Sequence, residues 1–206
     1  MKGLFITMEG VEGCGKTTQT ALLRDYLSGL GRDVLVTREP GGTAIGEAIR
    51  AILLDRAHVA MSAWAELLLY AAARAQHVDE VIRPALAAGR IVLCDRFADS
   101  TTAYQGGGRA LPSESIERLH EIAIRGVWPD LTLVIDVPPE EGLARARRAL
   151  DRIESEPPSF HERVREAFCE LARREPDRVK LVSGLQPVER VAAAVRTHVD
   201  ALLSRA

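Results

Sequence analysis

Hydrophobic residues occur in two patterns along the chain. Short, nearly continuous apolar runs predict strands buried on both faces, and longer segments with apolar residues three or four positions apart predict amphipathic helices. The predicted strands are Leu4–Met8, Val34–Thr37, Ile91–Cys94, Leu131–Val137 and Val179–Val182. The predicted helices are Lys16–Gly29, Thr43–Leu54, Ala63–Ala88, Pro112–Gly126, Glu140–Leu150, Ser159–Arg174 and Pro187–Ser204. Because strands and helices alternate, we predict one three-layer α/β domain over residues 1–206, with a mostly parallel sheet covered by helices.

The predicted helix Ala63–Ala88 carries two separate stripes. Its polar stripe holds Glu66, Tyr70, Arg74 and His77. This stripe is either a solvated face or, because Tyr70 and Arg74 are neighbours four residues apart, a ring and a guanidinium that clasp a base. The apolar stripe is predicted to pack on the core. Its members are Trp64, Leu68, Ala71, Ala75 and Ile82.

A glycine-rich segment, EGVEGCGKTTQ, follows the first predicted strand and precedes a predicted helix. Residues Gly10–Thr17 fit the phosphate-binding pattern G-x-x-x-x-G-K-[ST] in its required setting. Lys16 is expected to reach the β- and γ-phosphates, and the Thr17 hydroxyl to reach Mg²⁺. Cys14 is either a small residue tolerated in this loop or a thiol activated by the helix N-terminus. The predicted phosphate-binding set is Gly10, Val11, Glu12, Gly13, Cys14, Gly15, Lys16, Thr17 and Thr18.

Composition and charge narrow the class of nucleotide-binding protein. The formal net charge of −2 gives no sign of a nucleic-acid partner. Three cysteines without a Cys-x-x-Cys pair argue against a disulfide scaffold and a zinc site, and favour a reducing cytoplasm. No apolar run approaches the roughly 18 residues of a membrane helix. The chain contains no asparagine, which excludes the Asn-Lys-x-Asp guanine reader of GTP-binding switches.

A small phosphate-transferring enzyme also needs a pocket for the acceptor, and two segments at predicted strand ends offer one. TREPGG places Arg38 and Glu39 after the second strand, although this segment is also typical of a plain turn. In DRFADSTTAYQGGGR, Asp95 is placed to hold the hydration shell of magnesium, and Arg96 to bind a phosphate. The alternative for these two residues is a surface salt bridge. Hydrogen-bonding side chains follow at Ser100, Thr101, Tyr104 and Gln105.

An arginine-rich segment, ARARRALDRIE, lies at Ala144–Glu154. It contains Arg145, Arg147, Arg148 and Arg152. Alternating charge is typical of a solvated helix, but in a kinase such a segment could close as a lid over the transferring phosphoryl group.

Taken together, EGVEGCGKTTQ, TREPGGT, DRFADSTTAYQGGGR and LDRIE resemble the motifs of the bacterial thymidylate kinase family in order and spacing. The resemblance extends from Phe5 to about Ala201. It implies transfer of the ATP γ-phosphate to thymidine monophosphate (dTMP) with Mg²⁺, a five-stranded parallel sheet ordered 2-3-1-4-5, a lid at about residues 145–156, and a homodimer. Mg²⁺ would be held by Thr17 and Asp95, largely through water.

The resemblance also implies roles for individual residues. Glu12 and Glu39 would lie near the deoxyribose and the transferring phosphate, and Arg50 and Arg96 would bind the acceptor phosphate. Tyr70 would stack on thymine, Arg74, Thr101 and Gln105 would bond its edge, and Tyr104 would disfavour ribose. The implied dTMP-binding set is Glu39, Pro40, Arg50, Tyr70, Arg74, Arg96, Thr101, Tyr104 and Gln105.

The phosphate-binding loop has no arginine at its variable positions, so the chain resembles the members of the family that carry the catalytic arginine in the lid. The implied catalytic set is Lys16, Arg96, Asp95, Glu12, Arg152 and Arg148. Two other functions stay open at this point. One is a kinase for another nucleoside monophosphate, and the other is a regulatory nucleotide-binding module that hydrolyses ATP slowly.

Overall fold

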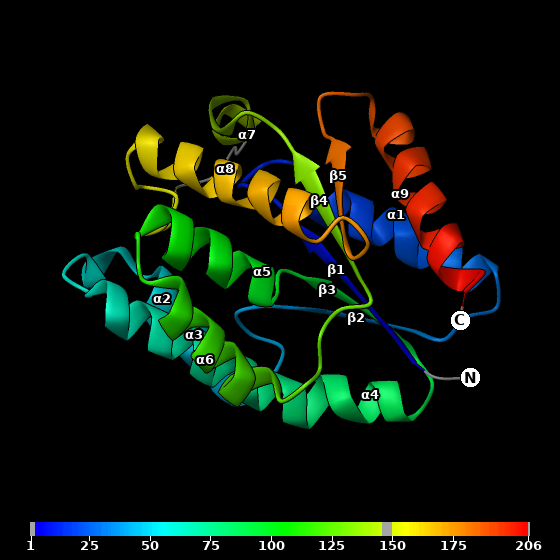
Figure 1. Ribbon diagram of the computed structural model, residues 1–206, viewed down its shortest axis with the longest axis horizontal. Helices are drawn as coiled ribbons and strands as arrows, with labels where there is room; N and C mark the ends of the chain where they lie inside the picture. The colour runs from blue at the N-terminus through cyan, green and yellow to red at the C-terminus, as the bar shows by residue number, and fades with distance from the viewer. Residues whose placement is uncertain (1–2, 146–149, 206) are drawn as a thin grey trace.

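A parallel β-sheet runs through the centre of the computed structural model, which describes residues 3–145 and 150–205 (Figure 1). The strands lie in the order β2-β3-β1-β4-β5, and every neighbouring pair is parallel. The predicted fold class and strand order are confirmed. The bounds are β1 (Leu4–Glu9), β2 (Val34–Arg38), β3 (Ile91–Asp95), β4 (Leu131–Asp136) and β5 (Val179–Ser183).

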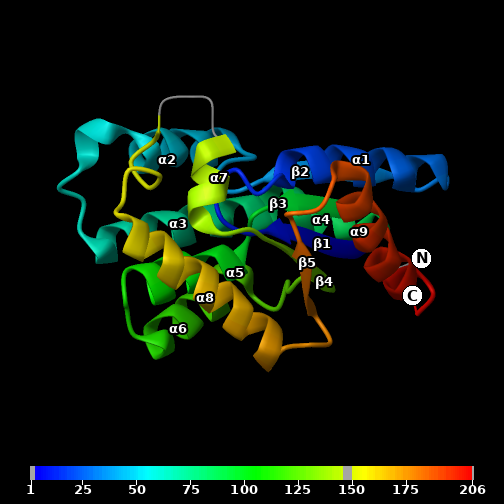
Figure 2. The same ribbon diagram turned by 90° about the horizontal axis from the view of Figure 1, so that it is seen from above.

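Helices cover both faces of this sheet (Figures 1 and 2). On one face lie α1 (Lys16–Gly29) and α9 (Val188–Leu203). On the other lie α3 (Ala63–His77), η2 (Val78–Ile82), α4 (Arg83–Ala87), α5 (Ala98–Thr101), η3 (Thr102–Gly108), α6 (Ser113–Ile124) and α8 (Pro158–Arg174). The remaining elements are α2 (Ala44–Leu54), which packs on α3, the short turn η1 (Arg56–His58), and α7 (Pro139–Arg145), which contacts α8. None of the helices formed by residues 3–145 and 150–205 combines the length and the apolar character that crossing a membrane requires.

Successive side chains of the central strand β1 point to opposite faces of the sheet and so belong to two separate hydrophobic clusters. Ile6 and Met8 belong to a cluster that includes Leu23 and Leu27 of α1, whereas Phe5 packs in a second cluster on the opposite face. The rings of Phe5 and Phe97 meet edge to face, with centroids 4.8 Å apart. A strand buried on both sides reads as a continuous apolar run, which is why the sequence predicted it well.

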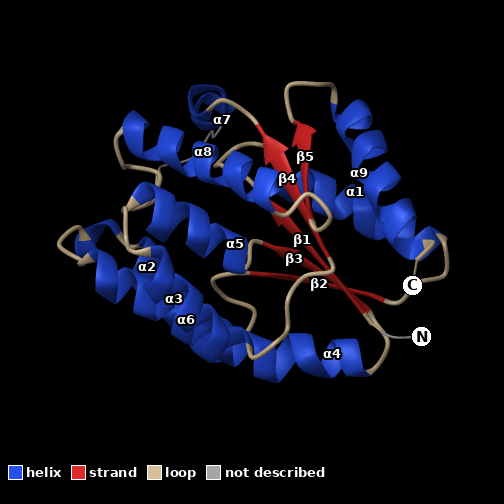
Figure 3. Ribbon diagram, viewed as in Figure 1, coloured by secondary structure: helices blue, strands red, loops and turns tan. Residues whose placement is uncertain are grey.

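The predicted helix Ala63–Ala88 is present as the consecutive elements α3, η2 and α4, of which η2 is a π-helical turn. Figure 3 shows where α3 and α4 lie among the other helices. The N–H of Arg83 reaches back to the carbonyl of Val78, five residues earlier. Pro84, in the first turn of α4, has no N–H to donate, and we attribute the change of pitch to this missing donor.

The predicted apolar stripe is correct at Ala71 and Ile82, which are buried, but wrong at its N-terminal end. Trp64 and Leu68, expected in the core, are 47% and 54% exposed, whereas Glu66 and His77 are fully buried. The polar side of α3 turns toward other polar groups of the protein, so the usual rule that a polar stripe faces water does not hold here.

Sequence analysis predicted no helix in ADSTTAYQGGG, yet this segment forms α5 and the π-helical η3. Its glycines permit close packing against α8. A Cβ at Gly108 would lie 2.5 Å from the ring of Phe160, and one at Gly107 would lie 2.7 Å from Ala167. Packing on α8 therefore stabilises a helix that intrinsic propensity disfavours.

Candidate functional site

A cavity of about 250 Å³ opens beyond the carboxyl ends of β1, β2 and β3. Strand register brings this edge together, because Arg38 and Met8 both pair with Asp95. Ligands bind at this edge in open α/β sheets. The lining residues are Glu12, Gly13, Lys16, Thr17, Arg38, Glu39, Pro40, Arg50, Leu54, Tyr70, Asp95, Arg96, Ser100, Thr101, Tyr104, Gln105, Asp151, Ile153 and Glu154.

The phosphate-binding loop curls tightly between β1 and α1. Gly10 and Gly15 take φ angles of 129° and 103°, which residues other than glycine rarely adopt. The Lys16 Nζ atom donates to the carbonyls of Gly10 (3.1 Å) and Val11 (2.9 Å). Lys16 and Thr17 line the cavity, whereas Thr18 is exposed on the first turn of α1 and Cys14 is buried.

Arg96 connects this loop to the segment after β3. Its guanidinium donates to the Gly10 carbonyl and to Glu12 Oε1, both at 2.9 Å, and lies over the ring of Tyr104. The Tyr104 hydroxyl also donates to Glu12 Oε1, at 2.7 Å. Burial alone would raise the pKa of Glu12, but Arg96 and Lys16 outweigh it and hold that pKa below its ordinary value. Glu12 is therefore a fixed negative charge at the rim of the loop.

Two oxygen-bearing side chains of the cavity, Thr17 and Asp95, lie close together. Thr17 Oγ1 lies 3.4 Å from Asp95 Oδ2, and both residues line the cavity. Residues 3–145 and 150–205 contain no cluster of three His, Cys, Asp or Glu side chains that could hold a metal ion. This pair fits an ion that takes most of its ligands from water and phosphate, as Mg²⁺ does.

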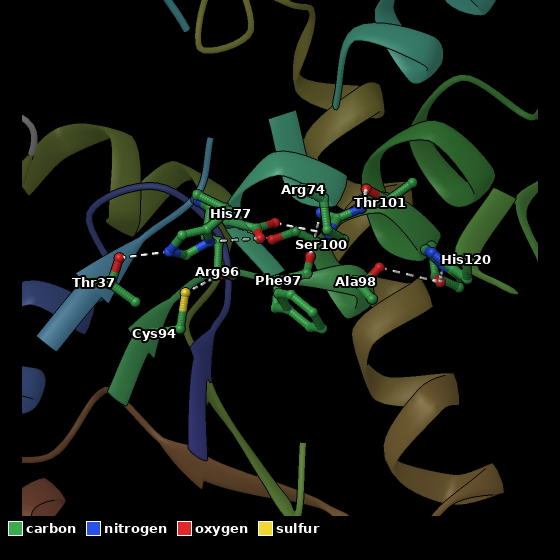
Figure 4. Close-up of polar contacts among 12 residues, drawn as sticks. Thr37, Arg74, His77, Cys94, Arg96, Phe97, Ala98, Ser100, Thr101 and His120 are labelled. Carbon is green, nitrogen blue, oxygen red and sulfur yellow. Dashed lines mark hydrogen bonds and ion pairs between the residues drawn. The ribbon is translucent and has the colours of Figure 1, made fainter. Parts of the chain in front are cut away.

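A buried polar chain crosses the floor of the site (Figure 4). Arg74 donates to Glu39 Oε2 (2.8 Å), to Thr101 Oγ1 (2.9 Å) and to the carbonyl of Phe97 (3.0 Å). His77 contacts Glu39 Oε1 through Nδ1 and Thr37 Oγ1 through Nε2. Thr101 and Glu39 line the cavity, whereas Arg74 is buried behind them. Arg74 and His77 thus orient cavity residues, a partnership between distant segments that the sequence did not reveal.

The remaining acceptor-side residues come from α2, α3 and the turn after β2. Arg50 Nη1 donates to the carbonyl of Pro40 at 2.8 Å, and both residues line the cavity. The Glu39–Pro40 peptide is cis. Tyr70 of α3 also lines the cavity. Burial raises the pKa of its hydroxyl group above the ordinary value. Apart from Arg74, the structure brings the predicted dTMP-binding residues to one cavity.

Sequence analysis overlooked Glu9, the last residue of β1. Its carboxyl group accepts from the Phe97 N–H at 2.7 Å and from the Ser100 hydroxyl at 2.5 Å. Full burial, reinforced by Asp99, raises its pKa to about 7. Glu9 therefore ties the start of the phosphate-binding loop to α5. The sequence does hold a sign that Glu9 is a functional residue: it is a carboxylate at the end of a mostly apolar strand, directly before the glycine-rich loop.

Neither of the two lid arginines that the structure describes, Arg145 and Arg152, lines the cavity. Arg152 is buried, with Nη1 at 2.7 Å from Glu66 Oε2 and Nε donating to the Leu53 carbonyl. Arg145 donates to the carbonyl of Gly184. Arg148, the other predicted catalytic arginine, lies outside the described residues. Asp151, Ile153 and Glu154 reach the cavity, so part of the predicted lid borders the site.

Comparisons of the sequence and of the structure with known proteins point to the same family. A family model described as Thymidylate kinase matches residues 8–195. The thymidylate kinase of Geobacter sulfurreducens is 53% identical over 98% of this chain and 98% of its own. That of Trichlorobacter lovleyi is 50% identical, also over 98% of both chains. A crystal structure of thymidylate kinase from Ehrlichia chaffeensis is 35% identical and aligns with a TM-score of 0.80, covering 97% of this chain and 99% of that one.

Proposed function

This chain belongs to the thymidylate kinase family and transfers the γ-phosphate of ATP to dTMP, and we propose that the cavity at the ends of β1, β2 and β3 is where the transfer occurs. The observation that carries this proposal is that Lys16 of the phosphate-binding loop and the predicted acceptor residues line one cavity. Donor and acceptor bound in one cavity can meet in line, which supplies most of the catalysis in phosphoryl transfer.

On the donor side, the loop from Gly10 to Thr18 binds the ATP phosphates through its backbone N–H groups and Lys16. Thr17 and Asp95 would hold Mg²⁺, directly or through water, and the 3.4 Å separation of their oxygens suits shared ligands of one ion. When bound, Mg²⁺ neutralises charge on the β- and γ-phosphates. Lys16 adds a mobile positive charge beside the phosphoryl group that moves from ATP to the dTMP phosphate oxygen, leaving the bridging oxygen on ADP.

On the acceptor side, Arg50 and Arg96 bind the 5′-phosphate of dTMP, because both guanidinium groups line the cavity, Arg50 beside Pro40 and Arg96 beside Glu12, whereas Arg38, which also lines it, is paired with Glu47. Glu12 keeps Arg96 oriented, and Glu39 and Glu12 border the sugar. Tyr104 stands beside them with its hydroxyl committed to Glu12, which leaves its ring to crowd a ribose 2′-hydroxyl.

For the base, Tyr70 stacks on the ring while Thr101 and Gln105 bond its edge. Arg74 would contribute through Thr101, to which it donates at 2.9 Å, or through a remaining N–H directed at a base oxygen. Thymine and uracil differ by one methyl group, which an apolar pocket distinguishes by only about 1–3 kcal/mol. Weak use of dUMP is therefore expected.

The lid arginines complete the proposed catalytic set. Arg148 and Arg152 would stabilise charge on the transferring phosphoryl group, as the P-loop positions Val11–Cys14 supply no arginine. For Arg152 this role requires its guanidinium to leave Glu66, with which it is paired at 2.7 Å. A closing movement of the segment that contains it would be part of the reaction cycle.

We also propose a homodimer that works in the cytoplasm. Apolar side chains on the adjacent helices α2 and α3 are exposed, including Ile45 and Ile52 as well as Trp64 and Leu68. A second copy of the chain would cover them. All three cysteines are free, which suits a reducing compartment.

The test is ADP release with Mg·ATP and one monophosphate at a time: dTMP, dUMP, dCMP, AMP, GMP or none. We expect the highest rate with dTMP, a low rate with dUMP and almost none without an acceptor. Equal ADP release with and without acceptors would instead indicate a nucleotide-hydrolysing regulatory module.

A further inference from the structure

Glu66 of α3 is a buried carboxylate that accepts hydrogen bonds from three side chains on two separate segments. Gln105 Nε2 lies 2.9 Å from Oε1, and Arg152 Nη1 lies 2.7 Å from Oε2. Arg109 donates to both oxygens, at 3.1 Å and 3.0 Å. Gln105 lines the nucleotide cavity, whereas Glu66 and both arginines lie behind its wall.

The two arginines fix the charge of Glu66. Burial alone would raise its pKa, but hydrogen bonds from Arg109 and Gln105, with the charge of Arg109, outweigh burial and lower the pKa below its ordinary value. An ionised carboxylate has no proton and can only accept hydrogen bonds. Arg109 donates to both oxygens, and the hydrogen bond from Arg152 lowers the pKa further.

The charge of Glu66 in turn fixes the orientation of the Gln105 amide. An amide has one donating end and one accepting end, and an acceptor-only neighbour must face the NH₂ group. The Oε1 atom of Gln105 therefore points away from Glu66. Gln105 borders the cavity, so a base bound there lies beside its amide.

We propose that Glu66 is a positioning residue that sets base selectivity, because it obliges Gln105 to present a hydrogen-bond acceptor to the bound base. A ring N–H, such as N3–H of thymine or uracil, pairs with this acceptor. Cytosine carries a lone pair at N3, so two acceptors would face each other and cytosine would be rejected. The inference rests on the proposed binding of the dTMP base between Tyr70 and Gln105.

The primary test is Glu66→Gln, measured as the ratio of kcat/KM for dTMP to kcat/KM for dCMP. A glutamine can donate as well as accept, so the Gln105 amide is free to turn its NH₂ group toward the base. We expect the ratio to fall by about tenfold or more, while KM for ATP stays within about twofold. Such a change of preference is not produced by general loosening of the fold, which lowers both rates together.

The neutral glutamine of Glu66→Gln could leave Arg152 without its carboxylate partner and so unfold the protein. A second variant covers that outcome. Glu66→Asp keeps the charge for the two arginines but withdraws the acceptor from Gln105 by one methylene group. We expect the dTMP/dCMP ratio to fall for this variant as well. Glu156→Gln is the matched control, because it removes the other carboxylate partner of Arg109 without touching Gln105. Its ratio should equal that of the unmodified protein.

A double-mutant cycle tests whether Glu66 acts through Gln105. In a Gln105→Leu background, replacing Glu66 should change the dTMP/dCMP ratio by less than about twofold, whereas it changes the ratio strongly when Gln105 is present. The proposal is overturned if folded Glu66→Asp and Glu66→Gln proteins keep the original ratio, or if the ratio changes equally in both backgrounds. Failure of the unmodified protein to prefer dTMP would overturn the proposed function itself, before any variant is compared.

Discussion

Glu9 makes the unfolding free energy of this protein depend on pH in an unusual direction. Its pKa is raised from 4.5 to about 7 in the folded state, because the side chain is fully buried and Asp99 lies nearby. A raised pKa means that the folded state binds the proton more tightly than the unfolded chain. The stabilisation by this group is complete below about pH 4.5 and is lost as the pH rises through 7.

The difference between the two pKa values sets the size of the effect. About 2.5 pKa units correspond to roughly 3 kcal/mol at most, at about 1.4 kcal/mol per unit. Glu9→Gln keeps an oxygen to accept from the Phe97 N–H and a neutral NH₂ group to face the Ser100 hydroxyl. The variant should therefore lack this pH dependence while retaining the contacts to α5.

The assay is urea unfolding followed by far-ultraviolet circular dichroism at a series of pH values from about 4.5 to 8.5. We expect the free energy of unfolding of the original protein, relative to Glu9→Gln, to fall by up to roughly 3 kcal/mol across this range. Glu117→Gln, which changes an exposed carboxylate on α6, should give a constant difference. A constant difference for Glu9→Gln as well would show that Glu9 is already ionised at neutral pH, and would refute the reasoning.

Three further substitutions test the proposed catalytic groups. Lys16→Ala should abolish transfer, because the β- and γ-phosphates lose their nearest positive charge, and single-turnover kinetics with near-normal kcat would contradict the phosphate-loop assignment. Arg96→Ala should weaken dTMP far more than ATP in separate binding titrations, whereas equal loss of both would mean that Arg96 does not bind the acceptor phosphate. Arg152→Ala should lower kcat with little change in either KM. If only the melting temperature falls, Arg152 is a structural partner of Glu66.

The sheet and the phosphate-binding loop could be predicted because their signals are local. Buried parallel strands such as β3 are continuous apolar runs, and the loop needs glycines and Lys16 at fixed spacing. On the acceptor side, strand ends and helix spacing indicated Arg96, Tyr70 and Gln105 as candidates, whereas Arg50 could be predicted only through resemblance. Arg50 lies on α2, and only tertiary packing brings it to the same cavity as Gln105.

Where the prediction failed, the rule that polar residues face water was misleading. The polar stripe of α3 is buried, because Glu66 and His77 find partners on η3 and after β2. The exposed Trp64 lies on the opposite side of the helix. Glu9 and the helix α5–η3 were missed for the same reason, since their polar and glycine residues are stabilised by contacts that no short window of sequence contains.

The phosphate-binding loop packs directly against the helix α7 at two glycines. Gly13 of the loop and Gly142 of α7 lie so close that a Cβ on either would overlap the backbone near the other. The main-chain atoms of the two segments are in direct contact, and no space is left for a side chain between them. A side chain at either glycine would therefore force the loop and α7 apart. This contact requires glycine both in the loop that carries Lys16 into the cavity and in the helix that begins at Pro139.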